Sequence, residues 1–165
     1  MRPCSLLSLA TAVPPHVVEQ QEAKVGAREA FGGNKALFDR LAGVFDNAGI
    51  ARRHIVAPLD WYMSGHGWHD RNAVYLEASE SLFAEAAGAA IEKAGLKPDQ
   101  IDGVVTVSTT GIATPSLEAR AGPRLGLRDD VRRVPIFGLG CAGGVNGLAT
   151  TSRLAAAEPV IRARL

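Results

Sequence analysis

The chain contains 165 residues, of which 47% are hydrophobic and 21% are charged, and its formal net charge is +1. This length is sufficient for one sizeable core, and the composition is that of a globular protein rather than a disordered one. The near-neutral charge argues against a nucleic-acid-binding protein, and no apolar run reaches the length of a membrane span. Two cysteines do not make a disulfide framework, so we expect a cytoplasmic protein.

The beginning of the chain predicts one strand and two helices. The apolar residues 4–13 predict a strand, because a pair of prolines follows them and ends the run. Residues 18–31 have a weak helical pattern. Asn34 is a suitable N-cap for a second helix, in which apolar residues recur three and four positions apart, and Gly49 is placed to end it.

The middle of the chain predicts a short strand and a long helix. Residues 50–56 predict the strand, whereas the aromatic, glycine-broken residues 60–70 predict a loop. Asp70 is a plausible N-cap for a helix over residues 72–94, which are rich in Ala, Glu and Leu.

The rest of the chain alternates strands and helices. In chain order we expect a buried strand at 103–110, a helix capped by Ser116 and ending near Leu125, a strand at 131–138, a helix at 144–157 and the start of a strand at 159–165. This alternation predicts an α/β fold with a largely parallel sheet. The helix at 144–157 consists mainly of small residues, so we expect it to be buried between two layers.

One glycine-rich stretch, PIFGLGCAGGVNG at residues 135–147, has two interpretations. Gly138, Gly140 and Gly143 fit G-x-G-x-x-G, the spacing of a dinucleotide-binding turn. That turn requires a second strand ending in an acid about 20 residues further on. Only Glu158 stands near that position, and no second strand fits before it, so the nucleotide interpretation is the weaker one.

The second interpretation is a turn that presents a cysteine. Cys141 would lie at the start of a helix, where the helix dipole favours an anion. Backbone N–H groups of such a turn can also bind the oxyanion that forms when a thiolate attacks an acyl group. The alternative is that Cys141 is a small buried apolar residue, the role that we expect for Cys4.

A cysteine nucleophile normally works with a histidine. The pattern alone brings none of the chain's histidines to Cys141. A pair of histidines three residues apart could share a metal on a helix, but the glycines beside them disfavour a helix and no further ligand cluster is present, so we expect no metal site. The four histidines are His16, His54, His66 and His69.

The cysteine turn and its surroundings resemble the N-terminal half of type III polyketide synthases, the chalcone- and stilbene-synthase-like family. The most specific match is GLGCAGG, preceded by LGLRDDVRRVPIF. Supporting matches follow the family's order along the chain: ATAVPPH, FDNAGIARRHIV and VSTTGIATPSLEARAGPRLGL. The resemblance therefore covers essentially the whole chain.

The resemblance implies the N-terminal half of a thiolase-like fold, a homodimer, and a decarboxylative Claisen condensation of acyl-CoA with malonyl-CoA. These two thioesters are substrates, and no further cofactor is implied. Cys141 falls on the nucleophile that takes the starter acyl group. The family's catalytic His and Asn belong to a second half that the 165 residues do not include, so we expect these residues alone to be unable to condense.

The resemblance also implies substrate-binding residues. Thr109, Thr110 and Gly140 fall where the family lines its acyl pocket. Thr114 falls where a bulkier residue commonly reaches across the dimer into the partner's site, which implies a roomier pocket here.

One basic residue implies a CoA contact. Arg40 matches one of the residues that hold the CoA phosphates, although it is equally explained as a solvated helix charge. Gly43 and Asn47 occupy the places of two further basic residues, so the usual CoA grip is incomplete.

Two other functions stay open. A ketoacyl-ACP synthase would share the fold, but such enzymes typically carry alanines rather than GLG before the cysteine. A catalytically inactive half-domain that only pairs with another chain would share everything except the reactivity of Cys141.

Overall fold

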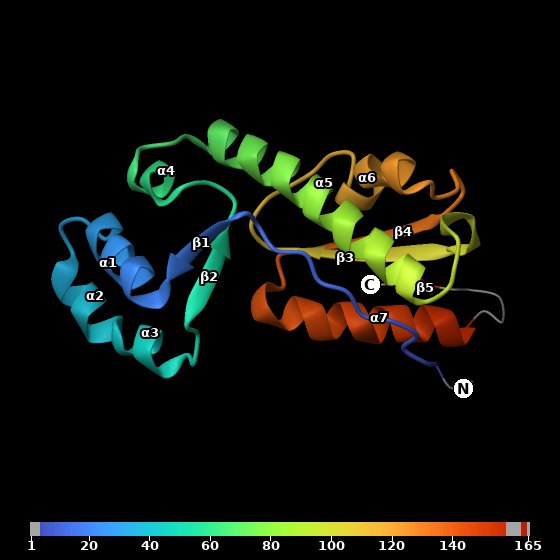
Figure 1. Ribbon diagram of the computed structural model, residues 1–165, viewed down its shortest axis with the longest axis horizontal. Helices are drawn as coiled ribbons and strands as arrows, with labels where there is room; N and C mark the ends of the chain where they lie inside the picture. Colours follow the sequence, from blue (N-terminus) through green and yellow to red (C-terminus); the bar gives the residue numbers. More distant parts are fainter. Residues whose placement is uncertain (1–3, 158–162, 165) are drawn as a thin grey trace. The chain divides into compact units, whose positions relative to one another are not determined.

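The computed structural model describes residues 4–157 together with Ala163 and Arg164. The chain divides into two compact units. Residues 13–74 form one, which we call the small unit, and residues 1–12 with 75–165 form the other, which we call the sheet unit. Figure 1 labels the elements of both.

The small unit combines a two-stranded antiparallel sheet with short helices. Strand β1 pairs with β2, and an aromatic cluster lies among the helices, where Phe38 is buried and contacts Phe31 and Phe45. Asn34 caps α2 as predicted, because its side-chain oxygen accepts a hydrogen bond from the Leu37 N–H. The elements are β1 (His16–Glu19), α1 (Gln20–Ala30), α2 (Lys35–Leu41), α3 (Gly43–Asn47), β2 (Arg52–Ile55) and α4 (Leu59–Met63).

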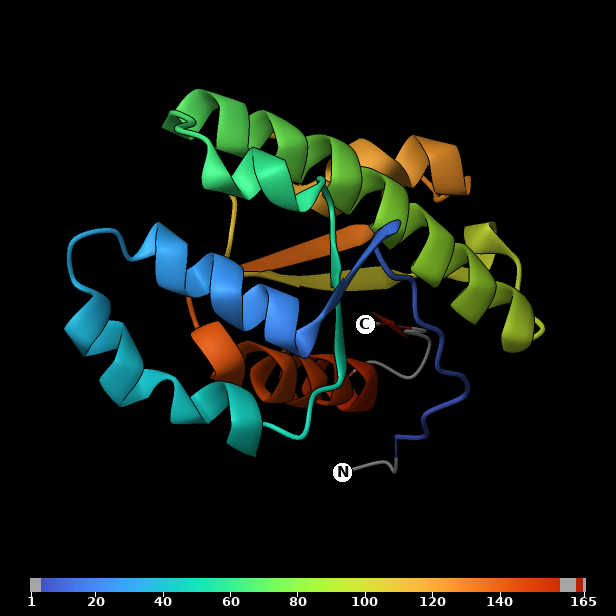
Figure 2. The same cartoon turned by 60° about the vertical axis from the view of Figure 1, so that its left-hand side comes forward.

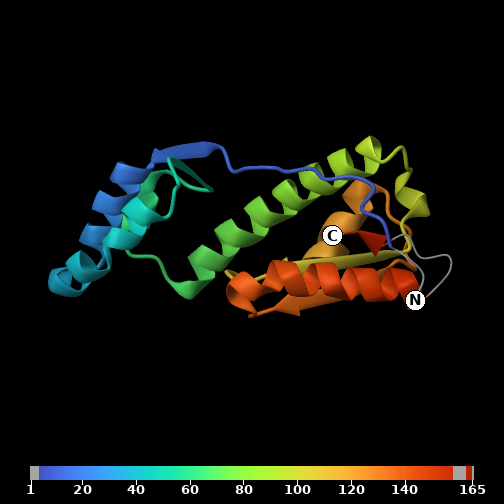
Figure 3. The ribbon, with the colours of Figure 1, turned by 90° about the horizontal axis from the view of Figure 1, so that it is seen from below.

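The sheet unit is built on three parallel strands in the order β4-β3-β5. Helices α5 and α6 cover one face of this sheet and α7 covers the other (Figures 1 and 2). Figure 3 shows α7 running alongside the strands. The elements are α5 (Trp68–Lys93, which begins in the small unit), the 3-10 turn η1 (Pro98–Gln100), β3 (Gly103–Ser108), α6 (Leu117–Leu125), β4 (Arg132–Phe137), the 3-10 turn η2 (Gly140–Ala142), α7 (Gly143–Ala157) and β5 (Ala163–Arg164).

The core of the sheet unit lies between α5 and the sheet. Its buried members are Ile91, Ile101, Val104 and Val131. β3 is the central strand, and its first four residues are buried as predicted for a strand covered on both faces. Helix α6 is joined to this strand by Glu118, whose carboxylate accepts a hydrogen bond from the Thr106 hydroxyl over 2.6 Å.

The predicted strand at residues 4–13 is wrong. Among its described residues the chain is extended but belongs to no sheet. Leu6, Leu7 and Leu9 are 77%, 62% and 73% exposed. Cys4, which we expected to be a buried residue of this strand, is exposed as well, so that expectation is also wrong. The segment is instead held along α5, where the Ser8 hydroxyl donates to the Ala90 carbonyl over 2.7 Å. Beside β3, β4 pairs along the whole strand on one side, and β5 pairs with Gly103 and Val104 on the other.

Two helix predictions need correction. The predicted loop at residues 60–70 contains most of α4 and the start of α5, so α5 begins at Trp68 and Asp70 is not its N-cap. The single helix predicted after Asn34 is divided at Ala42 into α2 and α3. Gly65 and Gly67 lie in the connection between the two helices, so the glycine-broken loop is real but shorter than predicted.

The expected fold class is confirmed only in its coarser form. The protein is α/β, but its strands form two small sheets, one antiparallel and one parallel, rather than one mostly parallel sheet. The antiparallel pair arises because β1 and β2 meet within the small unit. The prediction of a strand at residues 159–165 is described only at Ala163 and Arg164, and Glu158 lies outside the described residues.

Helix α7 begins and ends close to its predicted bounds, but it is not buried between two layers. Gly143, Gly147 and Thr151, spaced four apart, form its buried face against the sheet. Val145 and Leu148 on its other side are 73% and 56% exposed, since no described element covers them.

Candidate functional site

Two segments leave the same edge of the parallel sheet: residues 138–142, which we call the cysteine turn, and residues 109–116, which we call the threonine loop. β3 ends at Ser108 and β4 ends at Phe137, and these two residues are partners in the strand register. The Gly138 N–H donates to the Ser108 carbonyl over 3.2 Å, which ties the first residue of the turn to the end of β3. Ligands of open α/β sheets bind at this carboxyl edge.

Glycine backbone conformations shape the cysteine turn. Gly138 and Gly140 have φ angles of +82° and +52°, a region that residues with a side chain rarely adopt. Cys141 follows in the 3-10 turn η2, directly before α7, and it is exposed. The chain therefore has the predicted order of strand, glycine turn and helix, with the sulfur-bearing residue at the start of the helix.

Gly143 allows α7 to lie close to the sheet. A Cβ atom at this position would stand 2.5 Å from Cγ1 of Val107, which is far inside van der Waals contact. Its N–H donates to the Gly140 carbonyl and closes the turn. The first N–H groups of any α-helix point out of its N-terminus and attract negative charge, and here that end follows Cys141.

The threonine loop, residues 109–116, connects β3 to α6 and carries three of the predicted pocket residues. Thr109, Thr110 and Thr114 are exposed, and their hydroxyls form no hydrogen bond with any other described residue. The Thr114–Pro115 peptide bond is cis. The structure thus brings Thr109, Thr110 and Gly140 to the edge that holds Cys141.

Arg40 lies in α2 of the small unit, whereas Cys141 belongs to the sheet unit. Its side chain is exposed and forms no ion pair within the described part of the chain. Gly43 begins α3 and Asn47 ends it, one and two turns beyond Arg40.

Neighbouring charges in the small unit differ from Arg40 because they are paired. Lys24 contacts Asp46 over 2.8 Å and Arg28 contacts Asp39 over 2.9 Å, so two cations of α1 are neutralised by carboxylates of the next two helices. The hydrogen bonds from Arg28 and Lys24 lower the pKa of Asp39 and Asp46 respectively.

All four histidines belong to the small unit, so the sheet unit offers Cys141 no imidazole. Nδ1 of His54 lies 3.1 Å from the Pro14 carbonyl, which can only accept, so this contact requires the tautomer with the proton on Nδ1. His66 stacks on Trp61 with ring centroids 4.2 Å apart, and its Nε2 lies 2.9 Å from the Ser64 hydroxyl. Over the described residues, no three of His, Cys, Asp and Glu gather in a way that could hold a metal ion.

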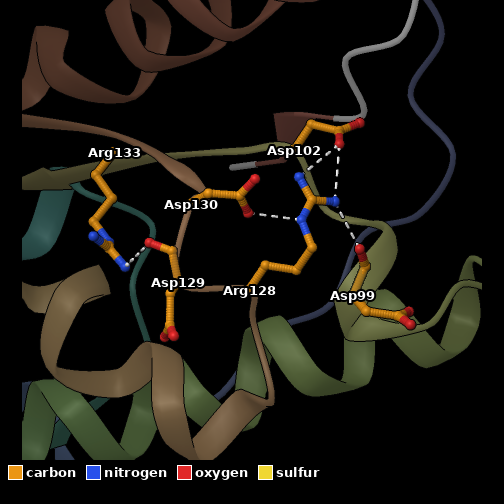
Figure 4. A network of polar contacts seen from close by, with 6 residues as sticks. All are labelled: Asp99, Asp102, Arg128, Asp129, Asp130 and Arg133. Atoms are coloured by element: carbon orange, nitrogen blue, oxygen red, sulfur yellow. Dashed lines mark hydrogen bonds and ion pairs between the residues drawn. The ribbon is translucent and has the colours of Figure 1, made fainter.

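The opposite edge of the same strand pair carries a charge network centred on Arg128 (Figure 4). Its guanidinium donates to Asp130, to Asp102 and to the Asp99 carbonyl, over 2.8, 3.1 and 2.7 Å. Hydrogen bonds to Asp130 and then to Asp102 raise the pKa of Arg128, and the bond from Arg128 lowers the pKa of Asp130. These residues lie just before β3 and β4 begin, far along the strands from the cysteine turn.

Sequence reasoning missed two residues at the carboxyl edge. The Tyr75 hydroxyl of α5 lies 2.6 Å from the Ser108 hydroxyl, which donates in turn to the Gly111 carbonyl over 3.0 Å. Tyr75 follows no motif, and Ser108 reads only as a strand residue, so the sequence contains no local signal for this contact.

Comparison with known proteins identifies the class of this chain. The family "Chalcone and stilbene synthases, N-terminal domain" matches residues 2–164, so the chain belongs to that family. It is 39% identical over 150 residues to a 1,3,6,8-tetrahydroxynaphthalene synthase of Streptomyces peucetius subsp. caesius, covering 89% of this chain and 39% of that protein. It is 34% identical over 159 residues to a putative chalcone synthase of Bacillus subtilis (strain 168), covering 93% of this chain and 44% of that protein.

Solved structures agree with this placement. The crystal structure of 1,3,6,8-tetrahydroxynaphthalene synthase from Streptomyces coelicolor A3(2), a bacterial type III polyketide synthase, superposes with a TM-score of 0.84 at 30% identity. That match covers 94% of this chain and 45% of the other. The chain therefore corresponds to the N-terminal part of such enzymes and spans less than half the length of these relatives. Among the residues that the structure describes, no helix is both long enough and apolar enough to cross a membrane.

Proposed function

We propose that this chain is the nucleophile-bearing half of a type III polyketide synthase and that Cys141 accepts the starter acyl group. In this step the Cys141 thiolate attacks the carbonyl carbon of an acyl-CoA, a new carbon–sulfur bond forms, and CoA leaves as its thiolate. The observation that carries the proposal is the exposed Cys141 in a strand–glycine turn–helix junction, in a chain that belongs to this family.

The surroundings of Cys141 support acyl transfer. Cys141 lies directly before the N-terminus of α7, the end of a helix that attracts negative charge. Turns of this kind can bind the oxyanion that forms during attack through backbone N–H groups. In this turn the N–H groups of Gly138, Ala142 and Gly143 already donate to carbonyls of the chain, so we assign the oxyanion to the remaining ones. Thr109 and Thr110 emerge at this edge with hydroxyls that no described residue binds, so they can line the pocket around the acyl chain.

Two further parts of the proposal concern binding. Arg40 binds a phosphate of CoA, which fits an exposed guanidinium without a described ion-pair partner. The exposed apolar side of α7, with Val145 and Leu148, supports packing against the second half of the synthase, which supplies the His and Asn for condensation with malonyl-CoA. We propose a homodimer in which Thr114 faces the partner's site.

Acyl loading tests the proposal directly. Incubation with an acyl-CoA should add one acyl mass to the intact chain, and peptide mapping should place it on Cys141. The Cys141→Ala variant should stay unmodified, whereas Cys4→Ala should load like the parent. Acylation of Cys4 in place of Cys141, or of neither, would contradict the proposed function.

Condensation is a separate test. With acyl-CoA and malonyl-CoA together, these 165 residues should load but form no triketide, because the groups that stabilise the enolate are proposed to lie in the second half. Triketide formation by these residues alone would overturn that division of labour. Extension with malonyl-ACP but not malonyl-CoA would favour a ketoacyl-ACP synthase instead.

A further inference from the structure

Ser108 joins the two segments of the proposed site. Its backbone carbonyl accepts the Gly138 N–H over 3.2 Å and so holds the first residue of the cysteine turn. Its hydroxyl donates to the Gly111 carbonyl over 3.0 Å and so holds the threonine loop. One residue at the end of β3 therefore fixes both segments: its backbone carbonyl holds the cysteine turn and its hydroxyl holds the threonine loop.

The direction of the hydrogen bonds at Ser108 follows from proton counting. A serine hydroxyl has one proton, and a carbonyl can only accept, so that proton is donated to Gly111. The Tyr75 hydroxyl, 2.6 Å away, must then donate to the Ser108 oxygen. The result is a chain from Tyr75 through Ser108 to Gly111, in which each bond polarises the next.

Packing supports the same contact. The ring of Tyr75 lies where the side chain of residue 111 would be: a Cβ atom there would stand 2.1 Å from Cδ1 of Tyr75. Gly111 is buried, and no positive φ requires glycine at this position. Glycine is therefore needed for the space that the tyrosine ring fills, and the ring and the hydroxyl of Tyr75 both restrain the loop.

We infer that Tyr75 is a positioning residue that holds the threonine loop at a fixed distance from the cysteine turn and thereby sets which acyl chains Cys141 accepts. The inference rests on the proposed function. Tyr75 itself touches no reacting atom. It acts through Ser108 and Gly111 on a loop whose Thr109 and Thr110 carry no hydrogen bonds of their own within the described chain.

The test compares Tyr75→Phe with Tyr62→Phe in the protein that carries this chain. Tyr62 is the chain's other tyrosine, and its hydroxyl binds no described residue, so the control removes the same atom without breaking the contact. Acylation of Cys141 is timed with acyl-CoAs from two to twelve carbons. Tyr75→Phe should change the ratio of long-chain to short-chain rates by about fivefold, the factor of one lost hydrogen bond, and Tyr62→Phe should leave it unchanged.

Amide hydrogen exchange separates positioning from function. Peptides covering residues 109–116 should exchange about fivefold faster in Tyr75→Phe than in Tyr62→Phe, because a restrained loop opens more readily when the restraint is lost. Ser108→Ala breaks both bonds, so adding Tyr75→Phe to it should change the rate ratio no further. Additive effects would contradict action through Ser108.

The outcomes are distinguishable. Unchanged exchange in Tyr75→Phe overturns the hydrogen-bond chain, whatever Cys141 does. Faster exchange with an unchanged chain-length ratio overturns the role in acyl selection. If the parent protein is not acylated at all, the proposed function fails and the selection role fails with it, while the exchange data still decide whether Tyr75 holds the loop.

Discussion

The two ends of the β3–β4 strand pair are fastened in different ways. At the end where the strands begin, Arg128 binds Asp130, Asp102 and the Asp99 carbonyl, so charged side chains form the cross-links. At the end where they finish, the links are a backbone hydrogen bond from Gly138 to Ser108 and neutral hydroxyl contacts. The first end pairs the Arg128 guanidinium with two carboxylates and a backbone carbonyl, whereas the second leaves Cys141 and the threonine hydroxyls exposed.

This difference separates stability from chemistry along one pair of strands. Charged cross-links are screened and pH-dependent, but they stand far from the proposed site. Backbone conformation and neutral hydrogen bonds keep their geometry over a wide pH range, which suits a turn that we propose to hold a nucleophile. Changes at the two ends should therefore affect different measurements.

The largest effect should come from the sulfur. Cys141→Ser should abolish acyl incorporation, because an alcohol is a far weaker nucleophile at neutral pH than a thiol near a helix N-terminus. Since Cys141 is exposed, the free energy of unfolding of the Cys141→Ser variant should stay within about 0.5 kcal/mol of the parent value. Intact-mass analysis and urea unfolding measure the two quantities, and a strongly destabilised variant would show that Cys141 is structural.

The next largest effect should come from a substitution that disturbs the close packing of α7 against the sheet. Gly143→Ala places a Cβ 2.5 Å from Val107, so it should destabilise the protein by about 1–3 kcal/mol and displace the helix that follows Cys141. Gly144→Ala is the matched control: nothing lies within 4 Å of its Cβ, so it should be neutral or stabilise α7 by up to about 1 kcal/mol. Equal unfolding midpoints for the two variants would refute the close contact.

A substitution in the cysteine turn should lower the free energy of unfolding less than Gly143→Ala does, and it should slow acylation of Cys141 more. Gly138→Ala must adopt a φ of +82°, at a cost of about 1–2 kcal/mol, although its Cβ meets no neighbour within 4 Å. The acylation rate should fall because the turn relaxes away from that conformation. Gly138→Asn, which tolerates positive φ better, should recover part of the loss. Gly33→Ala, at an open position without positive φ, should leave both measurements unchanged.

The smallest effect should come from the charged end. Arg128→Gln should lower the urea midpoint modestly at pH 7, because the ion pairs are exposed, and it should not alter acylation of Cys141. Arg128 lowers the pKa of Asp130, so its contribution is present above the unfolded pKa of about 3.9 and is lost as pH falls through the lower folded value.

The corresponding measurement is urea unfolding of parent and variant between pH 2 and pH 7, in which the difference should shrink toward the acid end. Arg133→Gln is the control, since within the described residues Arg133 contacts no carboxylate and donates to the Asp129 carbonyl over 3.4 Å. A difference that grows on acidification would contradict this assignment.

Sequence patterns predicted the elements whose structure is determined by their own residues and immediate neighbours in the chain. Strand β3 is apolar throughout its first half, α6 has Gly126 as a left-handed C-cap, and α7 follows a glycine turn, so each could be located from the residues. The cysteine turn was recognisable from its glycines. Gly138 and Gly140 adopt positive φ angles that favour glycine, and their spacing in the sequence already indicated a tight turn. The family follows from the same motif.

The predictions that were wrong share a physical cause. Whether a strand pairs, and whether a helix face is covered, depends on residues far away in the sequence. Residues 4–13 have the apolar pattern of a strand, yet whether they join a sheet depends on which strands already flank β3. The small residues of α7 permit burial, but burial also needs a second layer, and no described element covers Val145 and Leu148. Tyr75 and Gly111 are separated by most of α5 and all of β3, so only the folded chain shows that one fills the space left by the other.

The most direct test of the central claim is competition between the two cysteines for iodoacetamide at pH 7. Cys4 and Cys141 are both exposed, so accessibility does not distinguish them and the helix start does. We predict that native Cys141 is alkylated at least about tenfold faster than Cys4, and that the two rates converge when the chain is unfolded in urea. Equal rates in the native protein would contradict the account.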